Sequence, residues 1–172
     1  MFAQARKIVE NLPRKAHVIA KKTADNDRIM AEILETPEQI SEAESASLKR
    51  VLRLPSSNVM SFKFPKYGWP TNKKKTELEL RNTYLLYKPL GATSVAGAFD
   101  LREVLQVEHD TENERVVLTF KKNQGSKRAG PVEISCGDHP EQVPAWYSML
   151  STRWDYIWTT LSEAAQRWSP SS

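Results

Sequence analysis

The sequence has little cysteine, little glycine and no long apolar run, and each shortage excludes a class of protein. Cys136 is the only cysteine among the 172 residues, so an internal disulfide cannot form and the chain fits a reducing, cytoplasmic compartment. No run approaches the roughly 20 apolar residues that a membrane-spanning helix needs. The opening MFAQARKIVE is charged throughout and is no secretory signal, and Phe2 stands where myristoylation requires glycine.

Patterns that carry catalysis or hold metals are also missing. The six glycines form neither a Walker loop nor a GxGxxG fingerprint, and no GxSxG elbow marks a nucleophile. His17, His109 and His139 lie far apart and show no metal-ligand spacing. Cys136 falls in an expected strand, where a small buried side chain is the ordinary interpretation. We therefore expect no enzyme activity, no metal and no cofactor.

Positive charge is concentrated in one short part of the chain. Residues 59–88 hold seven lysines and arginines against two acids, a net +5, whereas the whole chain has a net charge of +4. The segment KYGWPTNKKK, residues 66–75, contains no acid at all. Such local asymmetry indicates an anionic partner more strongly than the overall charge does. No RRM, KH or helix-turn-helix pattern favours nucleic acid as that partner.

The first third of the chain favours helices. Helical patterns cover residues 3–12 and 15–35, although the apolar positions of the second are sparse. A third helix is expected after Thr36, which can cap it, with Pro37 in the first helical position and Pro55 at its end. PSSN, residues 55–58, then marks a boundary.

Beyond that boundary the apolar period changes from that of a helix to that of a strand. TELELRN alternates, with Leu78 and Leu80 on one face, and Asn82-Thr83 forms a turn into YLLYK. Short strands separated by polar turns favour an antiparallel barrel or sandwich. The seven expected strands cover residues 59–64, 76–82, 84–88, 95–101, 103–110, 115–123 and 131–137.

The C-terminal part predicts one long helix that begins near Pro144. Its apolar residues recur every three or four positions, which is typical of a helix face packed on a core. They are Trp146, Leu150, Trp154, Ile157, Leu161, Ala165 and Trp168. We divide the chain into a helical, partly flexible arm (1–56), a strand-rich domain (57–168) and a tail (169–172).

A helical arm, seven strands and one final Trp-bearing helix together resemble a pleckstrin homology (PH) domain. The resemblance rests on the basic connection between the first two strands, on the hairpin LELRNTYLLYK, on GAFDLREVLQV and VVLTFKK, and on the final helix. It implies a seven-stranded antiparallel PH-like barrel capped by the long C-terminal helix. Trp146 or Trp154 would be the core tryptophan that the family usually carries early in this helix.

The same layout, with the region KYGWPTNKKKTELELRNTYLLY, resembles the acylated PH-domain proteins of apicomplexan parasites. Members of that group are tethered by an N-terminal lipid and read phosphatidic acid on micronemes, so the resemblance implies a peripheral protein of that organelle surface and of exocytosis. Phe2 departs from the glycine of acylated members.

The resemblance also implies where a lipid phosphate is held. Lipid-binding PH domains use a lysine on the first strand, then a basic residue two positions before an arginine on the second. Lys75 fits the basic residue, but Glu77 replaces the arginine, which disfavours a tight phosphoinositide site. The candidate lipid-binding residues are Lys63, Lys66, Lys73, Lys74, Lys75, Arg81 and Lys88.

Trp69 and Pro70 are the candidate membrane-inserting residues. An indole favours the headgroup boundary, and Pro70 limits the entropy lost on insertion. Alternatively the lysines are simply solvated, or form a protein or nucleic-acid patch, and Trp69 folds back on the barrel. The basic turn 121–128 could add phosphate contacts or be solvated.

Three functions fit these features. The first is a non-enzymatic module that recruits the protein to anionic membranes, preferably phosphatidic acid and possibly phosphoinositide, in trafficking or regulated secretion. The second is a protein-interaction scaffold with a PH-like fold that has lost lipid binding, and a protein partner could also use the N-terminal arm. The third is an enzyme regulator whose arm masks the basic loop.

Overall fold

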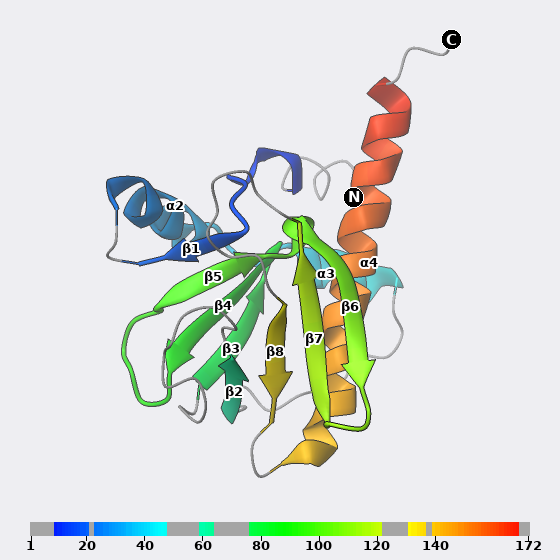
Figure 1. Ribbon diagram of the computed structural model, residues 1–172. Coiled ribbons are helices and arrows are strands. Elements are labelled where there is room, and N and C mark those ends of the chain that lie inside the picture. The colour runs from blue at the N-terminus through cyan, green and yellow to red at the C-terminus, as the bar shows by residue number, and fades with distance from the viewer. Residues whose placement is uncertain are drawn as a thin grey trace.

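The computed structural model describes residues 9–20, 23–47, 59–63, 76–121, 131–136 and 139–168 (Figure 1). The fold mixes helices with antiparallel strands. Three α-helices have their bounds defined in these ranges: α2 (Ala24–Glu35), α3 (Ile40–Ser47) and α4 (Val143–Trp168). Two 3-10 turns, η1 (Leu101–Glu103) and η2 (Pro140–Gln142), precede β6 and α4. The strands are β1 (His17–Ile19), β2 (Val59–Lys63), β3 (Thr76–Arg81), β4 (Tyr84–Pro89), β5 (Gly97–Asp100), β6 (Val104–Asp110), β7 (Arg115–Phe120) and β8 (Val132–Ser135).

The strands form two sheets that share β2. Their order is β1-β5-β4-β3-β2-β8-β7-β6, with every neighbouring pair antiparallel. β2 pairs with β3 through Val59 and Met60, and with β8 through Ser61, Phe62 and Lys63. The seven antiparallel strands expected after residue 57 and the C-terminal helix are therefore confirmed. A closed barrel is not, because β1 and β6 stand at the two ends of this order among the described strands.

The hairpin of β3 and β4 forms as its alternation predicts. The register joins Glu77 to Lys88 and Leu80 to Leu85 around the turn Asn82-Thr83. Asn82 takes a left-handed conformation with φ of 51°, which asparagine tolerates better than most residues. Leu78 is buried and Glu79 is exposed, as the alternation requires.

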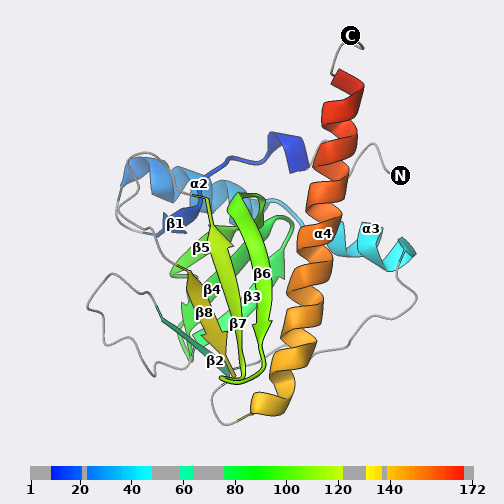
Figure 2. The ribbon, with the colours of Figure 1, turned by 45° about the vertical axis from the view of Figure 1, so that its right-hand side comes forward.

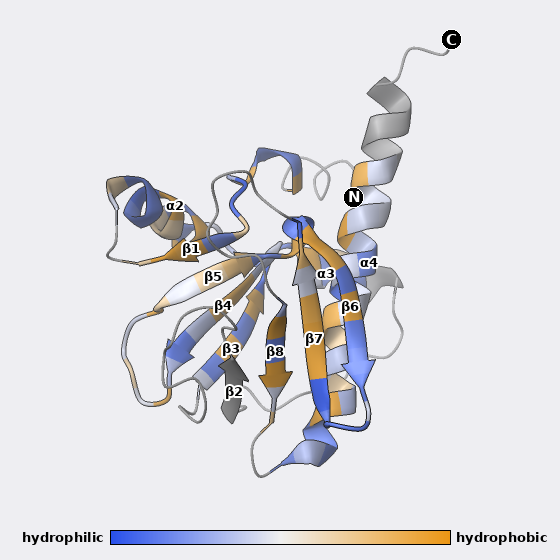
Figure 3. Cartoon of the chain, viewed as in Figure 1, coloured by the Kyte–Doolittle hydropathy of each residue, from blue (hydrophilic) through white to orange (hydrophobic). Residues whose placement is uncertain are grey.

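The main core lies between the strands and α4 (Figures 1 and 2). Trp146, Leu150 and Ile157 of α4 are buried, and Trp154 and Leu161 pack against them at the edge of the core. Figure 3 shows apolar residues along β7 and β8, and Val116, Leu118, Val132 and Ile134 of these strands belong to the same core. The predicted packing face of α4 is confirmed as far as Leu161.

A second apolar cluster covers the other face of β4 and β5. Ile29, Met30 and Ile33 of α2 pack there against Tyr84 and Leu86 of β4, with Val18 of β1 and Ala98 of β5. Because both faces of β4 are covered, four consecutive residues, Tyr84 to Tyr87, are buried. The N-terminal segment thus supplies part of the apolar packing.

The predicted helix from residue 15 to 35 is wrong in its first part. His17–Ile19 is β1, which pairs with Phe99, Ala98 and Gly97 of β5. The helix begins only after Thr23, whose hydroxyl accepts a hydrogen bond from the Asn26 N–H at 3.1 Å. The β-branched Val18 and Ile19 instead complete the edge of the sheet.

The predicted cap of the next helix is also wrong. Thr36 ends α2, since its N–H donates to the Glu32 carbonyl. α3 begins at Ile40, where Glu38 Oε1 accepts hydrogen bonds from the N–H groups of Ile40 and Ser41, each at 3.1 Å. A carboxylate near the start of a helix also interacts favourably with the helix dipole.

Candidate functional site

The basic loop predicted from the sequence connects two neighbouring strands. β2 ends at Lys63 and β3 begins at Thr76, and Met60 pairs with Thr76. Residues 64–75 lie outside the described residues. The candidate residues in that interval are Lys66, Trp69, Pro70, Lys73, Lys74 and Lys75. The structure places the remaining three candidates, Lys63, Arg81 and Lys88.

Lys63 and Lys88 both lie near the ends of the strands that the basic loop connects. Lys63 is the last residue of β2 and is the register partner of Glu133 on β8, which itself forms a 2.8 Å ion pair with Arg115. Lys88 lies one residue before Pro89, the register partner of Thr76. Both lysines are therefore close in the strand pairing to the ends of the 64–75 connection.

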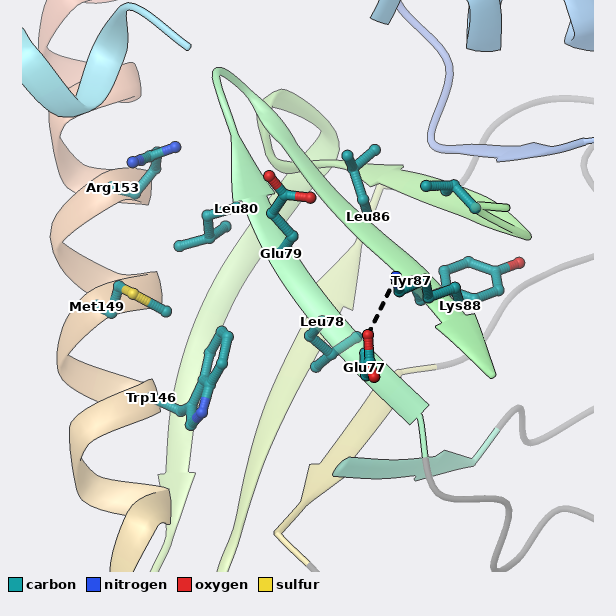
Figure 4. Close-up of a pocket in the computed structure, with 11 residues that line it drawn as sticks. Glu77, Leu78, Glu79, Leu80, Leu86, Tyr87, Lys88, Trp146, Met149 and Arg153 are labelled. Carbon is teal, nitrogen blue, oxygen red and sulfur yellow. Dashed lines mark ion pairs between the residues drawn. The ribbon is translucent and has the colours of Figure 1, made fainter. Parts of the chain in front are cut away.

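Lys88 forms an ion pair with Glu77 across the hairpin. Its Nζ lies 3.2 Å from Glu77 Oε2, and the side chains are 35% and 25% exposed (Figure 4). The charge of Glu77, which stands where lipid-binding PH domains carry an arginine, is thus compensated by Lys88. The signal for this contact was in the sequence, because a turn at Asn82-Thr83 sets Glu77 opposite Lys88.

Arg81 is not brought together with these residues. It ends β3, five residues beyond Thr76, which is about 17 Å along an extended strand. Its Nη1 donates to the Leu34 carbonyl at 3.0 Å, and its Nη2 lies 3.6 Å from Glu79. Arg81 therefore connects β3 to the end of α2.

A cavity of about 360 Å³ lies between β3 and α4 (Figure 4). It contacts Leu78 and Leu80 on the face of β3 toward α4, and Glu77 and Glu79 on the opposite face, so it extends around the strand edge. The other lining residues are Leu86, Tyr87, Lys88, Val95, Trp146, Met149 and Arg153. The sequence did not predict this cavity.

Two polar side chains of α4 line the cavity and differ in their partners. Trp146 is 3% exposed, and its Nε1–H has no hydrogen-bond partner within the described part of the chain. Arg153 is fully engaged: it donates to Glu44 at 2.9 and 3.3 Å, to Glu38 at 3.2 Å and to the Asn82 carbonyl at 3.1 Å. The two residues thus differ: Arg153 is held by α3 and the hairpin, whereas the Trp146 N–H is buried without a partner in the described residues.

Asn82 joins the same network from the β3–β4 turn. Its side chain accepts from the Gln39 N–H and donates to the Pro37 carbonyl, both at 3.0 Å, and its own N–H donates to Glu38 at 2.8 Å. Burial raises the pKa of the Glu44 carboxyl, against the lowering effect of Arg153. The network fastens α3 and the segment before it to the hairpin and to α4.

A second buried network lies under the N-terminal segment. Arg102 pairs with Asp100 at 2.8 Å, and both side chains are fully buried. The guanidinium also donates to the carbonyls of Val9 and Leu12 at 2.8 Å and to that of Pro13, which also accepts from the Tyr84 hydroxyl. Burial alone would lower the pKa of Arg102, but its hydrogen bonds and charge attraction to Asp100 outweigh this and raise it.

The weaker sequence candidates lie apart in the structure. His17 stacks on Phe99, with ring centroids 4.6 Å apart, His109 stacks on Tyr147 at 5.2 Å, and His139 lies 3.1 Å from Glu141. Burial raises the pKa of the Cys136 thiol to about 11, which keeps it protonated at neutral pH. Of the basic turn 121–128 only Lys121 is described, with its ammonium 4.8 Å from the Trp158 ring centroid.

No protein-family model matches the chain, and no curated protein matches it either. Among the helices of the described residues, none has the length and apolar character needed to cross a bilayer. Within the same residues, no group of three or more His, Cys, Asp or Glu side chains is placed to hold a metal ion.

Proposed function

We propose that this chain is a non-enzymatic lipid-binding module with a PH-like fold, which recruits the protein to anionic membranes. The observation that carries the proposal is the net charge of +5 within residues 59–88, centred on one connection between two adjacent strands. Near an anionic leaflet each lysine contributes on the order of 1 kcal/mol, so a cluster of lysines gives reversible recruitment.

The PH-like assignment is part of the proposal. It is supported by the strand order, by the two sheets that meet at β2, and by a C-terminal helix packed on the strands. The resemblance to acylated PH-domain proteins extends it to regulated secretion and to the cytoplasmic face of micronemes.

The lipid site we propose has one residue fewer than the set predicted from the sequence. It comprises the loop lysines with Lys63 and Lys88 at its base, and Trp69 with Pro70 as the inserting group. We leave Arg81 out because its guanidinium is engaged at the far end of β3. Without an arginine fork, simple phosphate groups such as that of phosphatidic acid suit the site better than an inositol polyphosphate.

A liposome sedimentation panel tests the proposal. The chain should pellet with vesicles that contain phosphatidic acid, less with vesicles that contain a phosphoinositide at equal surface charge, and not with neutral phosphatidylcholine. Sedimentation should weaken as salt rises, because exposed charges are screened. Equal pelleting with neutral and anionic vesicles, or none with either, would refute the proposal.

The rival function is a protein-interaction scaffold with a PH-like fold. The observation that favours it is the Glu77–Lys88 ion pair, which engages one lysine of the proposed lipid site. The same sedimentation panel separates the two functions, since a scaffold that has lost lipid binding stays in the supernatant with all vesicles.

A further inference from the structure

The turn between β4 and β5 begins beside the strand end to which the basic loop leads. β4 ends at Pro89, and Pro89 is the register partner of Thr76, the first residue of β3 after that loop. The chain then turns tightly, because the Ala92 N–H donates to the Pro89 carbonyl at 3.0 Å. Gly91 has φ of 82°, as the third residue of a type II turn requires. Leu90 is therefore held at the second position of the turn, at its outer end.

This turn exposes an apolar side chain and carries no charge. Leu90 is 46% exposed. A single exposed leucine is ordinary on a protein surface. Here, however, residues 89–99 contain no charged side chain, although 27% of the whole chain is charged. The other exposed residues of the turn are small or uncharged: Pro89, Gly91, Thr93 and Ser94.

The β6–β7 turn shows what a turn in contact with water alone looks like in the same fold. Its residues 111–114 are all exposed and include Glu112 and Glu114. Asp110 and Arg115 flank it and form an ion pair at 2.8 Å. An anionic leaflet would repel those two glutamates. The β4–β5 turn can enter a headgroup layer without the cost of removing a charge from water.

Lys88 connects the β4–β5 turn to the proposed lipid site. It lies two residues before Leu90, and its side chain is 35% exposed beside Glu77. The strength of peripheral membrane binding depends on the apolar area buried and on the electrostatic attraction to anionic lipid. The lysines supply the attraction, and Leu90 is an apolar side chain held rigidly next to them.

We propose that Leu90 enters the headgroup region of an anionic membrane and is a membrane contact in addition to the basic loop. This inference rests on the proposed lipid-binding function and adds a residue to that site. The ligand is the membrane itself, because a soluble phosphate offers no apolar phase for a leucine side chain. Removing the exposed part of Leu90 from water should strengthen binding about fivefold, which corresponds to about 1 kcal/mol.

Leu90→Ser in the full chain tests the contact by sedimentation with vesicles of phosphatidic acid and phosphatidylcholine. Binding should weaken about fivefold, with the midpoint of urea denaturation unchanged. Leu34→Ser is the matched control, since Leu34 is 42% exposed and its carbonyl accepts from Arg81 at the other end of β3. The control should bind as the wild type does. Leu90→Ala replaces the serine variant if that variant is less stable, with a smaller loss expected.

A fluorescent label at position 90 measures insertion directly. Leu90→Cys is made together with Cys136→Ala, so that the chain has one thiol, and is labelled with a dye whose emission rises in an apolar environment. Vesicles with phosphatidic acid should raise the emission, and nitroxide groups on their acyl chains should quench it. Inorganic phosphate and glycerol 3-phosphate should leave it unchanged. The same label at Leu34→Cys should respond to none of these additions.

The outcomes distinguish this inference from the lipid proposal beneath it. Wild-type sedimentation with equal binding by Leu90→Ser and an unquenched label would overturn this inference alone. Absence of sedimentation by the wild type would overturn both. Equal losses in the Leu90 and Leu34 serine variants would show that the position of the leucine does not matter, which also contradicts the inference. A label signal that rises with protein concentration and without vesicles would make a second copy of the chain the partner.

Discussion

Arg102 and Lys88 each pair with a carboxylate, yet their surroundings give the two pairs different roles. The Arg102–Asp100 pair is fully buried and extends to three carbonyls of the N-terminal segment. The Lys88–Glu77 pair is partly exposed at the edge that leads into the basic loop. Breaking a buried pair leaves a charge without compensation, whereas an exposed pair contributes at most about 1 kcal/mol.

The region around the Arg102–Asp100 pair is structural, whereas the region around the Lys88–Glu77 pair can respond to a binding partner. On the Arg102 side, a charged group is committed to holding β1 and the preceding residues on the sheet. On the Lys88 side, water can replace the partner of either charge at little cost. Substitutions near Arg102 should therefore change the stability of the fold, and substitutions near Lys88 should change binding.

Arg102→Met tests the first side and should have the largest effect. It should lower the free energy of unfolding by about 3–5 kcal/mol, because Asp100 is left buried without its partner. Urea denaturation followed by tryptophan fluorescence measures the loss. The double variant Arg102→Met with Asp100→Leu should recover part of it, and a single-variant loss below about 1 kcal/mol would contradict the structural role.

The double variant Lys73→Glu with Lys75→Glu tests the second side. Two charge reversals near an anionic surface should reduce vesicle binding by about 3 kcal/mol, more than a hundredfold, with stability unchanged. Liposome sedimentation and urea denaturation measure the two quantities. Arg14→Glu with Arg28→Glu is the matched control, because both arginines are exposed and precede the strand-rich domain. Equal losses in the two double variants would show that total charge, and not the loop, determines binding.

Alkaline pH should destabilise the core through Cys136. Its pKa rises from 9.0 to about 11 on folding, so the thiol keeps its proton in the folded state after the unfolded chain has lost it. Stability should be unaffected by this group below about pH 9 and should fall by up to about 2 kcal/mol between pH 9 and 11. Urea denaturation across that range measures it, and Cys136→Ala should show a shallower fall. Identical slopes would contradict the shift.

Glu77→Gln should have the smallest effect, and it should change both vesicle binding and stability slightly. It releases Lys88 from its ion pair, so vesicle binding should increase a few-fold, by about 1 kcal/mol or less, since one more lysine faces the lipid. Stability should change by less than about 1 kcal/mol, as expected for an exposed pair. Sedimentation against phosphatidic acid vesicles measures the increase, and weaker binding would place Lys88 outside the lipid site.

Helices and strands could be predicted from the sequence wherever their buried residues recur at the spacing of a helix or a strand. Alternation in TELELRN predicted the hairpin, and the spacing of Trp146, Leu150 and Ile157 predicted the buried face of α4. β1 was missed because its partner, β5, lies some 80 residues further along the chain, and two β-branched residues, Val18 and Ile19, are too short a local signal to predict a strand.

The amino-acid sequence alone predicts the concentration of charge in residues 59–88, the alternation of the strands and the apolar face of the last helix. These properties depend on residue type and on spacing within one element. Four side chains are placed only by the three-dimensional fold: Arg81 lies away from the basic loop, Arg102 and Arg153 are buried in networks, and Trp146 lines a cavity. The partners of those side chains come from distant segments, and no local pattern records such a contact.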